Sequence, residues 1–116
     1  WRLSHSLAPN IAGPHVGCKA VCAFNRAVFH KFYKPASVAC EVLDDVGGER
    51  SSVCRFNFRA VKSNGDAYQV EYALFAKTRE GGKVFEVVEL LDTHASNEQH
   101  AGKSDVGVPP VAGSKL

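Results

Sequence analysis

The chain has 116 residues, of which 45% are hydrophobic and 22% charged, so its length and composition predict one globular domain. The formal net charge is +2, which is too small an asymmetry to indicate binding to nucleic acid or to an acidic membrane surface. No stretch approaches the roughly 20 consecutive apolar residues that a membrane-spanning helix requires. We therefore expect no nucleic-acid partner and no membrane partner.

Residues 1–16 are predicted to form a flexible N-terminal arm, because Pro9, Gly13 and Pro14 interrupt any helix or strand. Ile11 is the candidate start of a short edge strand in this arm. The chain begins at Trp1 and contains no Met, which is typical of a processed product that has lost its initiator and a signal peptide.

Residues 17–33 show the periodicity of one amphipathic helix. Apolar side chains recur at steps of three and four residues, which places them on one face. They are Cys18, Val21, Phe24, Val28 and Phe32. Because Pro35 cannot continue a helix and pushes Lys34 toward extended geometry, we expect the helix to end near Tyr33.

Four stretches after the helix have the pattern of strands, at residues 37–43, 53–61, 67–77 and 84–91. In the first three, apolar and polar residues alternate, which is typical of an antiparallel sheet with one face in water. The fourth is apolar on both faces apart from Glu86 and Glu89. Because the apolar faces of helix and sheet must cover each other, we expect an α+β fold with one N-terminal helix packed on a four- to five-stranded antiparallel sheet.

The turn at Ser63-Asn64-Gly65 predicts the register of the second and third strands. A three-residue loop with Gly65 in the left-handed conformation keeps apolar residues opposite apolar residues, whereas a two-residue turn would set Phe58 against Glu71. The predicted pairs are Phe58 with Val70, Phe56 with Tyr72 and Cys54 with Leu74.

The first hairpin is treated in the same way. A three-residue loop at Val46-Gly47-Gly48 would pair Cys40 with Cys54 and Val38 with Phe56. The third hairpin turns near residues 79–82, but the fourth strand is apolar on both faces and does not fix its register.

From Thr93 onward the composition changes to Ser, Asn, Gln, Gly, His and Pro, so we expect a mobile C-terminal tail at residues 93–116 after a domain at 17–92. The last residues, Ser114-Lys115-Leu116, match a peroxisomal address. A peroxisomal location is therefore the alternative to a secreted one.

The four cysteines are an even number in a short chain, which favours two disulfides and an oxidising, extracellular location. Cys18 and Cys22 lie one helical turn apart, a geometry that disfavours a bond between them. Pairing of each with the sheet and a Cys40–Cys54 bond both stay open, as do four buried free thiols. The cysteines lack the close pairs of a structural zinc motif, so we expect no metal and no cofactor.

No catalytic residues are predicted. The histidines (His5, His15, His30, His94 and His100) are scattered, and no paired carboxylates or Asp–His dyad are visible. All four cysteines fall on inferred core faces, whereas a nucleophilic cysteine needs an exposed thiol. We therefore expect that the chain is not an enzyme.

Three segments, in order, resemble the cystatins, the tight-binding inhibitors of papain-like cysteine proteases. Ala20–Asn25 is similar to the plant cystatin helix pattern F-A-V-x-E-x-N, and Val84–Val88 to the fourth-strand pattern Y-E-A-K-V. Val61–Gly65 occupies the place of the Q-x-V-x-G hairpin, and Tyr68 follows at the usual distance. The Pro-Trp of the second cystatin binding hairpin is absent near Thr93-His94.

The resemblance implies a protease-binding wedge made of the N-terminal arm and the hairpin tip. Its residues are Gly13, Val61, Lys62, Ser63, Asn64 and Gly65. Val61 stands where the motif has Gln, and Ser63 where it has Val, so the loops are altered.

The leading hypothesis is thus a monomeric, cystatin-like protein-binding domain, with a papain-like cysteine protease as its partner. Two alternatives stay open. One is a secreted effector or defence-type interaction protein that uses the scaffold without inhibition. The other is an NTF2-like domain, in which a helix on a curved antiparallel sheet encloses a ligand pocket.

Overall fold

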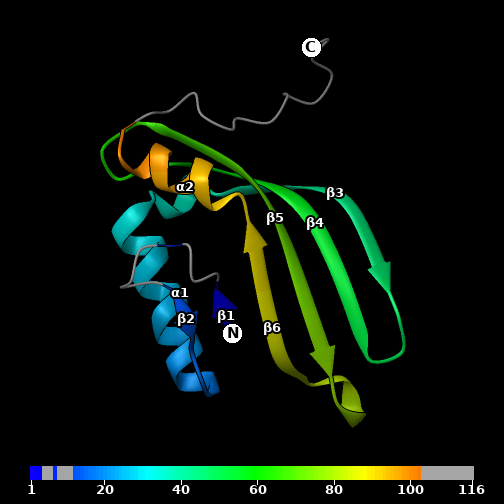
Figure 1. Cartoon of the computed structure of the whole chain (residues 1–116). Coiled ribbons are helices and arrows are strands. Elements are labelled where there is room, and N and C mark those ends of the chain that lie inside the picture. The colour runs from blue at the N-terminus through cyan, green and yellow to red at the C-terminus, as the bar shows by residue number, and fades with distance from the viewer. Residues whose placement is uncertain (4–6, 8–11, 103–116) are drawn as a thin grey trace.

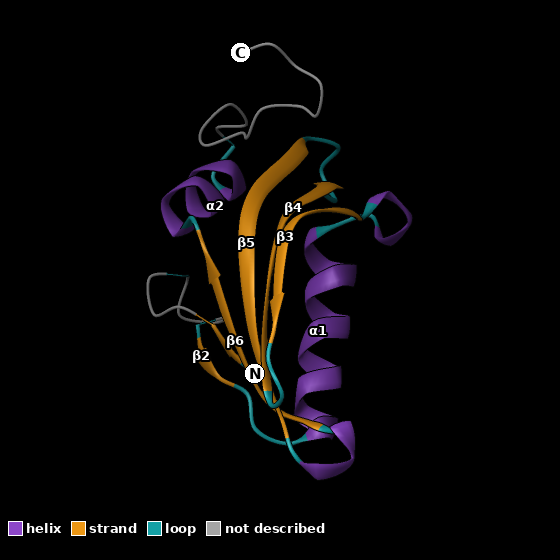
Figure 2. Ribbon diagram, turned by 90° about the vertical axis from the view of Figure 1, so that its right-hand side faces the viewer, coloured by secondary structure: helices purple, strands orange, loops and turns teal. Residues whose placement is uncertain are grey.

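The computed structural model describes residues 1–3, 7 and 12–102. One long helix, α1 (Cys18–Phe32), lies along the concave side of a strongly curved sheet, and a short helix, α2 (Thr93–His100), follows the last strand (Figures 1 and 2). The long strands are β3 (Ala39–Gly47), β4 (Ser51–Val61), β5 (Ala67–Thr78) and β6 (Val84–Leu91). Short 3-10 turns, η1 (Pro35–Ser37) and η2 (Glu80–Gly82), precede β3 and β6.

The sheet is six-stranded and mixed, with the order β2-β1-β6-β5-β4-β3. Two short strands from the N-terminal segment, β1 (Arg2–Leu3) and β2 (Gly13–Pro14), extend it beyond β6. β1 runs parallel to β6, with Arg2 opposite Val88. The expected four- to five-stranded antiparallel sheet is therefore wrong, because a parallel contact between segments so far apart in sequence leaves no mark in local alternation. Ile11 lies outside the described residues.

The predicted register of β4 and β5 is confirmed. Phe58 lies opposite Val70, Phe56 opposite Tyr72 and Cys54 opposite Leu74. Gly65 has a φ of 96°, the left-handed conformation that the three-residue loop requires.

The predicted register of β3 and β4 is wrong. Cys40 lies opposite Phe58, and Cys54 lies opposite Asp45. A bulge between Val42 and Asp44 shifts the pairing, and the turn closes further along the chain, where the amide of Gly48 donates to the carbonyl of Ser51 at 2.7 Å. A bulge adds one residue to one strand, so the side chains beyond it change register.

Helix α1 ends as predicted, with Tyr33 as its C-cap. No residue of α1 is fully buried, although Val28, Phe29 and Phe32 pack against the core. That core lies at the end of the helix next to α2 and consists of Tyr33, Phe58, Ala60, Tyr68, Val70 and Ala95. The remainder of α1 therefore faces the sheet but does not pack tightly against it. Within the described residues, no helix is long and apolar enough to span a membrane.

Residues 93–100, expected in a mobile tail, form α2 instead. The side chain of Asp92 accepts a hydrogen bond from the amide of Ala95 at 2.9 Å and so caps the first turn. Ala95, Ser96 and Gln99 are buried. The helix is polar in sequence yet packs on the sheet through small and amide side chains, which composition alone does not reveal. Ser114–Leu116 lie outside the described residues.

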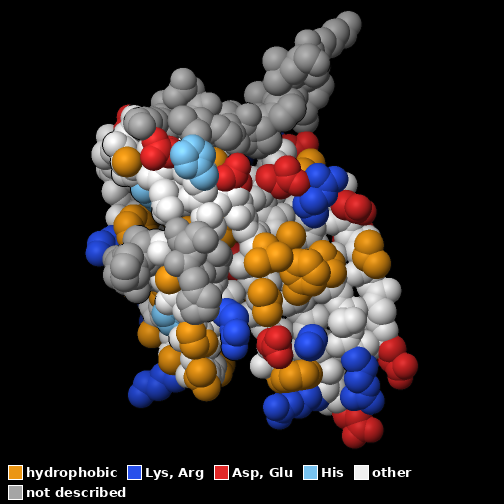
Figure 3. All heavy atoms as spheres, in the orientation of Figure 1, with side chains coloured by type: hydrophobic (Ala, Val, Ile, Leu, Met, Phe, Trp, Pro, Cys, Tyr) orange, Lys and Arg blue, Asp and Glu red, His pale blue; other side chains and the backbone are white. Residues whose placement is uncertain are grey.

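The outer face of the sheet is also partly apolar. Phe75 and Leu90 are 41% and 48% exposed there, and Figure 3 shows hydrophobic side chains grouped over β5 with charged side chains around them. Successive residues of a strand point to opposite faces, so this surface is separate from the concave side. Because the sheet carries apolar side chains on this outer surface as well as on the concave side, β6 is apolar on both faces.

The cysteines do not pair. All four are free; Cys18, Cys22 and Cys40 are exposed, and Cys54 is half-buried. The expected disulfides are therefore wrong, since the β3–β4 register sets Cys40 opposite Phe58 and not Cys54. The expectation that all four cysteines lie in the core is wrong for the helix pair, because Cys18 and Cys22 are exposed. The disulfide argument for secretion fails with them.

Candidate functional site

A cavity of about 260 Å³ lies between α1 and the concave face of the sheet. Helix α1 contributes three rings to its wall, and β4 contributes two more from the opposite side. These are Phe24, Phe29 and Phe32 from the helix and Phe56 and Phe58 from the strand. Other residues that line the cavity include Trp1, Tyr33, Tyr72, Leu74 and Leu91. No Lys or Arg is among the described residues that line it.

Aromatic rings form much of the cavity wall. The rings of Phe56 and Tyr72 stack with their centroids 5.6 Å apart, and Phe29 meets Phe58 at 6.2 Å. Because the β4–β5 register sets Phe56 opposite Tyr72, the hairpin pattern builds this part of the wall, and helix α1 adds Phe29 from the other side. Aromatic faces suit a flat, apolar ligand.

A chain of hydroxyl groups borders the end of the cavity next to α2. The Tyr68 hydroxyl lies 2.8 Å from the hydroxyls of both Tyr72 and Ser96, and the Tyr33 hydroxyl lies 3.3 Å from Nε2 of His100. Burial raises the pKa of Tyr33, Tyr68 and Tyr72. These phenols therefore stay protonated and can act as neutral hydrogen-bond donors.

His100 completes this polar end. Burial lowers the pKa of His100, and the nearby positive charge of Lys62 lowers it further. The imidazole is accordingly neutral near pH 7 and can accept or donate a hydrogen bond.

Glu89 is the carboxyl group of the cavity wall. The indole Nε1 of Trp1 donates to its Oε2 at 2.8 Å. Burial raises the pKa of Glu89, and the bond from Trp1 opposes that rise. Glu89 stands two residues before Leu91, which lies opposite Tyr72, so carboxyl and phenol share the concave face. A carboxyl group with a raised pKa holds its proton to a higher pH than an exposed one, which suits it to exchange a proton with a bound molecule.

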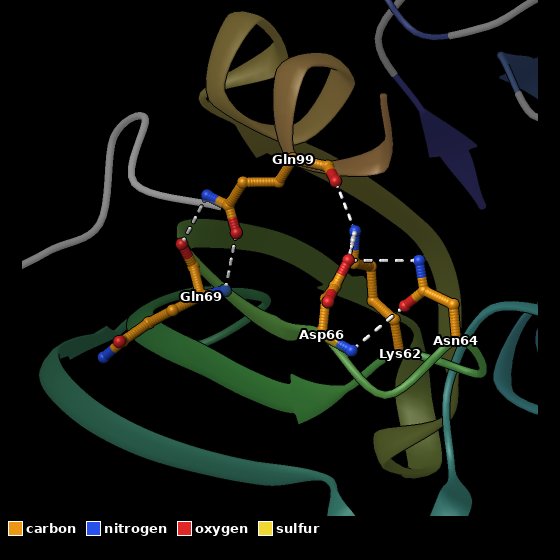
Figure 4. Close-up of polar contacts among 5 residues, drawn as sticks. All are labelled: Lys62, Asn64, Asp66, Gln69 and Gln99. Carbon is orange, nitrogen blue, oxygen red and sulfur yellow. Dashed lines mark hydrogen bonds and ion pairs between the residues drawn. The ribbon is translucent and has the colours of Figure 1, made fainter. Parts of the chain in front are cut away.

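Helix α2 is tied to the sheet by Gln99 and Lys62 (Figure 4). The side chain of Gln99 accepts from the amide of Gln69 and donates to its carbonyl, both at 2.9 Å. The ammonium of buried Lys62 donates to the backbone carbonyl of Gln99 and lies 3.9 Å from the carboxylate of Asp66. These contacts hold α2, and with it Ser96 and His100, against the end of the cavity.

The residues predicted to bind a protease do not line this cavity. Lys62 is buried under α2, and the hydroxyl of Ser63 donates to the carbonyl of Lys31 at 2.8 Å. The side chain of Asn64 accepts from the amide of Asp66 at 3.0 Å, which shapes the turn that includes Gly65. Val61 ends β4 and pairs with Ala67.

Gly13 lies elsewhere in the sheet. It belongs to β2, and both β1 and β6 stand between β2 and β5. Across residues 1–3, 7 and 12–102, no three His, Cys, Asp or Glu side chains lie close enough to hold a metal ion together.

No protein-family model matches the sequence. No curated protein matches it either. Solved structures do match in fold. An NTF2-like protein of unknown function from Burkholderia pseudomallei aligns with a TM-score of 0.69 and 18% identity over 84% of this chain and 72% of that one. The chain has an NTF2-like fold.

Two further solved structures match this chain in fold. TerC, co-crystallised with polyporic acid, aligns with a TM-score of 0.75 and 14% identity over 88% of this chain and 76% of that one. A protein from Jannaschia sp. CCS1, whose name assigns it to the SnoaL-like polyketide cyclases, aligns with a TM-score of 0.64 and 18% identity, over 74% of this chain and 62% of that one. At these identities the likeness concerns the fold.

The resemblance to cystatins is wrong, and it was the reason for singling out the hairpin and Gly13. The matched motifs are short, and one of them contains an Asn-Gly pair that many hairpins use to turn. The useful signal was Glu89, one of two charges, with Glu86, in a strand that is otherwise apolar on both faces. Its role could not be predicted without knowing that the sheet curves around a cavity.

Proposed function

We propose that the cavity binds a small, flat, largely apolar molecule and that Glu89 exchanges a proton with it. The observation that carries the proposal is an aromatic-lined cavity whose wall includes one carboxyl group with a raised pKa. The absence of Lys and Arg from the described lining favours a neutral molecule over an anion.

The reaction class that fits is removal of a proton from a carbon next to a carbonyl group. The ionised Glu89 accepts the proton, and a raised pKa suits a general base that works near neutral pH. Negative charge then develops on the carbonyl oxygen. The phenol of Tyr72, which stays protonated, can donate a hydrogen bond to that oxygen.

Two neighbours support this proposal by analogy. One is named as a SnoaL-like polyketide cyclase, and the other was crystallised with polyporic acid. The expectation of a chain without enzymatic activity rested on the lack of visible acid–base groups in the sequence. Glu89 supplies such a group.

Trp1 makes a direct binding test possible, because it is the one tryptophan of the chain and lies in the cavity wall. We expect 2-naphthol to change its fluorescence saturably and 2-naphthoate, the matched anion, to bind at least about tenfold more weakly. The variant Leu91→Phe, which narrows the cavity, should weaken the binding of 2-naphthol. Equal responses to both probes in both proteins would contradict the proposed pocket.

Proton transfer is tested with 2-tetralone, a flat ketone with an acidic C–H group. We expect the protein to accelerate exchange of that proton for deuterium, followed by NMR, and Glu89→Gln to lose about 100-fold of this acceleration while still binding 2-naphthol. Exchange at the buffer rate with the unaltered protein would rule out the general-base role and leave the binding function standing.

A further inference from the structure

Two thiols lie side by side at the start of α1. The Sγ atoms of Cys18 and Cys22 are 4.0 Å apart, and both residues are exposed. Neither lines the cavity of the proposed function. Both border a second groove of about 630 Å³ between the beginning of α1 and the beginning of β6.

The helix itself holds the pair together. Residues four apart lie on the same face of an α-helix, one turn above the other. Cys18 is the first residue of α1 and Cys22 follows one turn later, so both sulfur atoms belong to one rigid element. A site built on a helix keeps its spacing without help from a loop.

The thiol of Cys18 raises the pKa of Cys22, and a positive metal ion bound by both sulfur atoms would offset that effect, as do the charges at the start of the helix. The first turn of α1 contains no acidic residue, and its cap, Gly17, makes no side-chain hydrogen bond to the free amides. These amides leave positive potential at the helix start. Arg26 stands one further turn along the same helix.

The spacing fits a shared ion better than a disulfide. With metal–sulfur bonds of about 2.3 Å, two thiolates on one ion lie at most about 4.6 Å apart, so the gap of 4.0 Å needs no movement of the helix. A disulfide would have to close the same gap to about 2.05 Å.

We propose that Cys18 and Cys22 form a two-thiolate site for a soft monovalent cation, with Cu(I) as the ion that fits best. Binding forms two Cu–S bonds and releases the two thiol protons. Zinc fits poorly, because it takes four ligands and no third His, Cys, Asp or Glu of the described chain joins the pair. Soft thiolates select Cu(I), which accepts two of them.

The test uses the full chain, fully reduced and without oxygen, and Cu(I) supplied as its coloured complex with bicinchoninate. We expect the protein to remove about one equivalent of Cu(I) from the complex. Cys18→Ser and Cys22→Ser should each abolish this transfer. Because both side chains are exposed, these variants should keep their fold, which the circular dichroism spectrum checks.

The matched control is the double variant Cys40→Ser/Cys54→Ser, which leaves the helix pair intact and should still bind one equivalent. If copper follows Cys40 and Cys54 instead, or if either helix variant binds as well as the unaltered protein, the site is wrong. A failure of naphthol binding would not affect this result, because neither Cys18 nor Cys22 lines the cavity proposed to bind naphthol.

Discussion

At the scale of single residues, burial decides which groups of the cavity can carry charge. It raises the pKa of Tyr33, Tyr68 and Tyr72, so these hydroxyls remain neutral donors throughout the usual working range. It also raises the pKa of Glu89, which brings that carboxyl closer to neutral pH. Glu89 is thus the carboxyl of the described cavity wall best suited to exchange protons.

Tyr68 links the hydroxyl network and is 1% exposed. Tyr68→Phe removes the partner of both the Tyr72 and Ser96 hydroxyls and should lower the free energy of unfolding by about 1–3 kcal/mol. Ser96→Ala removes one of those two bonds and should cost less. Urea unfolding of the three proteins measures this order, and a larger loss for Ser96→Ala would contradict the network.

Trp1 reduces the proton affinity that burial gives Glu89, through the hydrogen bond from its indole N–H. Because that hydrogen bond lowers the pKa of Glu89 against the effect of burial, Trp1→Phe should raise the pKa further. The ¹³C chemical shift of the Glu89 carboxyl, followed as a function of pH, measures the change. An unchanged midpoint would show that the indole does not influence this carboxyl in solution.

At the scale of elements, the sequence predicted structure wherever short-range chemistry determines it. Gly65 and the alternation around it gave the correct β4–β5 register, and Pro35 gave the end of α1. The bulge after Val42 could not be predicted, because one inserted residue leaves the turn signals unchanged. Helix α2 was missed for a related reason: its contact with the sheet depends on Gln99, a polar side chain.

Gln99 continues the β5 ladder where β6 has ended. The last pair between those strands is Tyr72 with Leu91. Beyond it, the carboxamide of Gln99 forms hydrogen bonds with the backbone amide and carbonyl of Gln69. Gln99→Met fills similar space without those bonds and should lower stability by about 2 kcal/mol.

The same change should speed hydrogen exchange at the Gln69 amide, which NMR measures directly. His94→Ala is the matched control on α2, since His94 is exposed, and it should leave that amide protected. Equal exchange in both variants would mean that Gln99 does not hold the strand edge.

At the scale of the whole molecule, the pocket exists because one helix covers a sheet of six curved strands. The tight core lies at one end, around Tyr33, Tyr68 and Val70, and the other rings of α1 stand across a cavity from β4. Hydrophobic periodicity predicts that the two apolar faces meet. It carries no information on sheet curvature, so it cannot tell direct packing from an enclosed space, and the candidate site was unpredictable for this reason.

Two titratable groups that line that cavity, His100 and Glu89, should give the stability of the molecule opposing responses to acid. His100 has a lowered pKa in the folded state, so its contribution is present above its ordinary value of 6.5 and is lost as the pH falls through the folded pKa. Glu89 has a raised pKa, so its contribution is present below its ordinary value of 4.5 and is lost as the pH rises through the folded pKa.

Single substitutions separate the two responses. His100→Gln should lose less stability than the unaltered protein when the pH is lowered from 7.5 to 5, because the folded state no longer resists protonation of an imidazole. Glu89→Gln should lose more over the same interval, because the gain from protonating a buried carboxyl is gone. Urea midpoints at the two pH values measure both differences. Parallel shifts in all three proteins would mean that neither group responds to its surroundings in the cavity, which would remove the electrostatic basis for a base at Glu89.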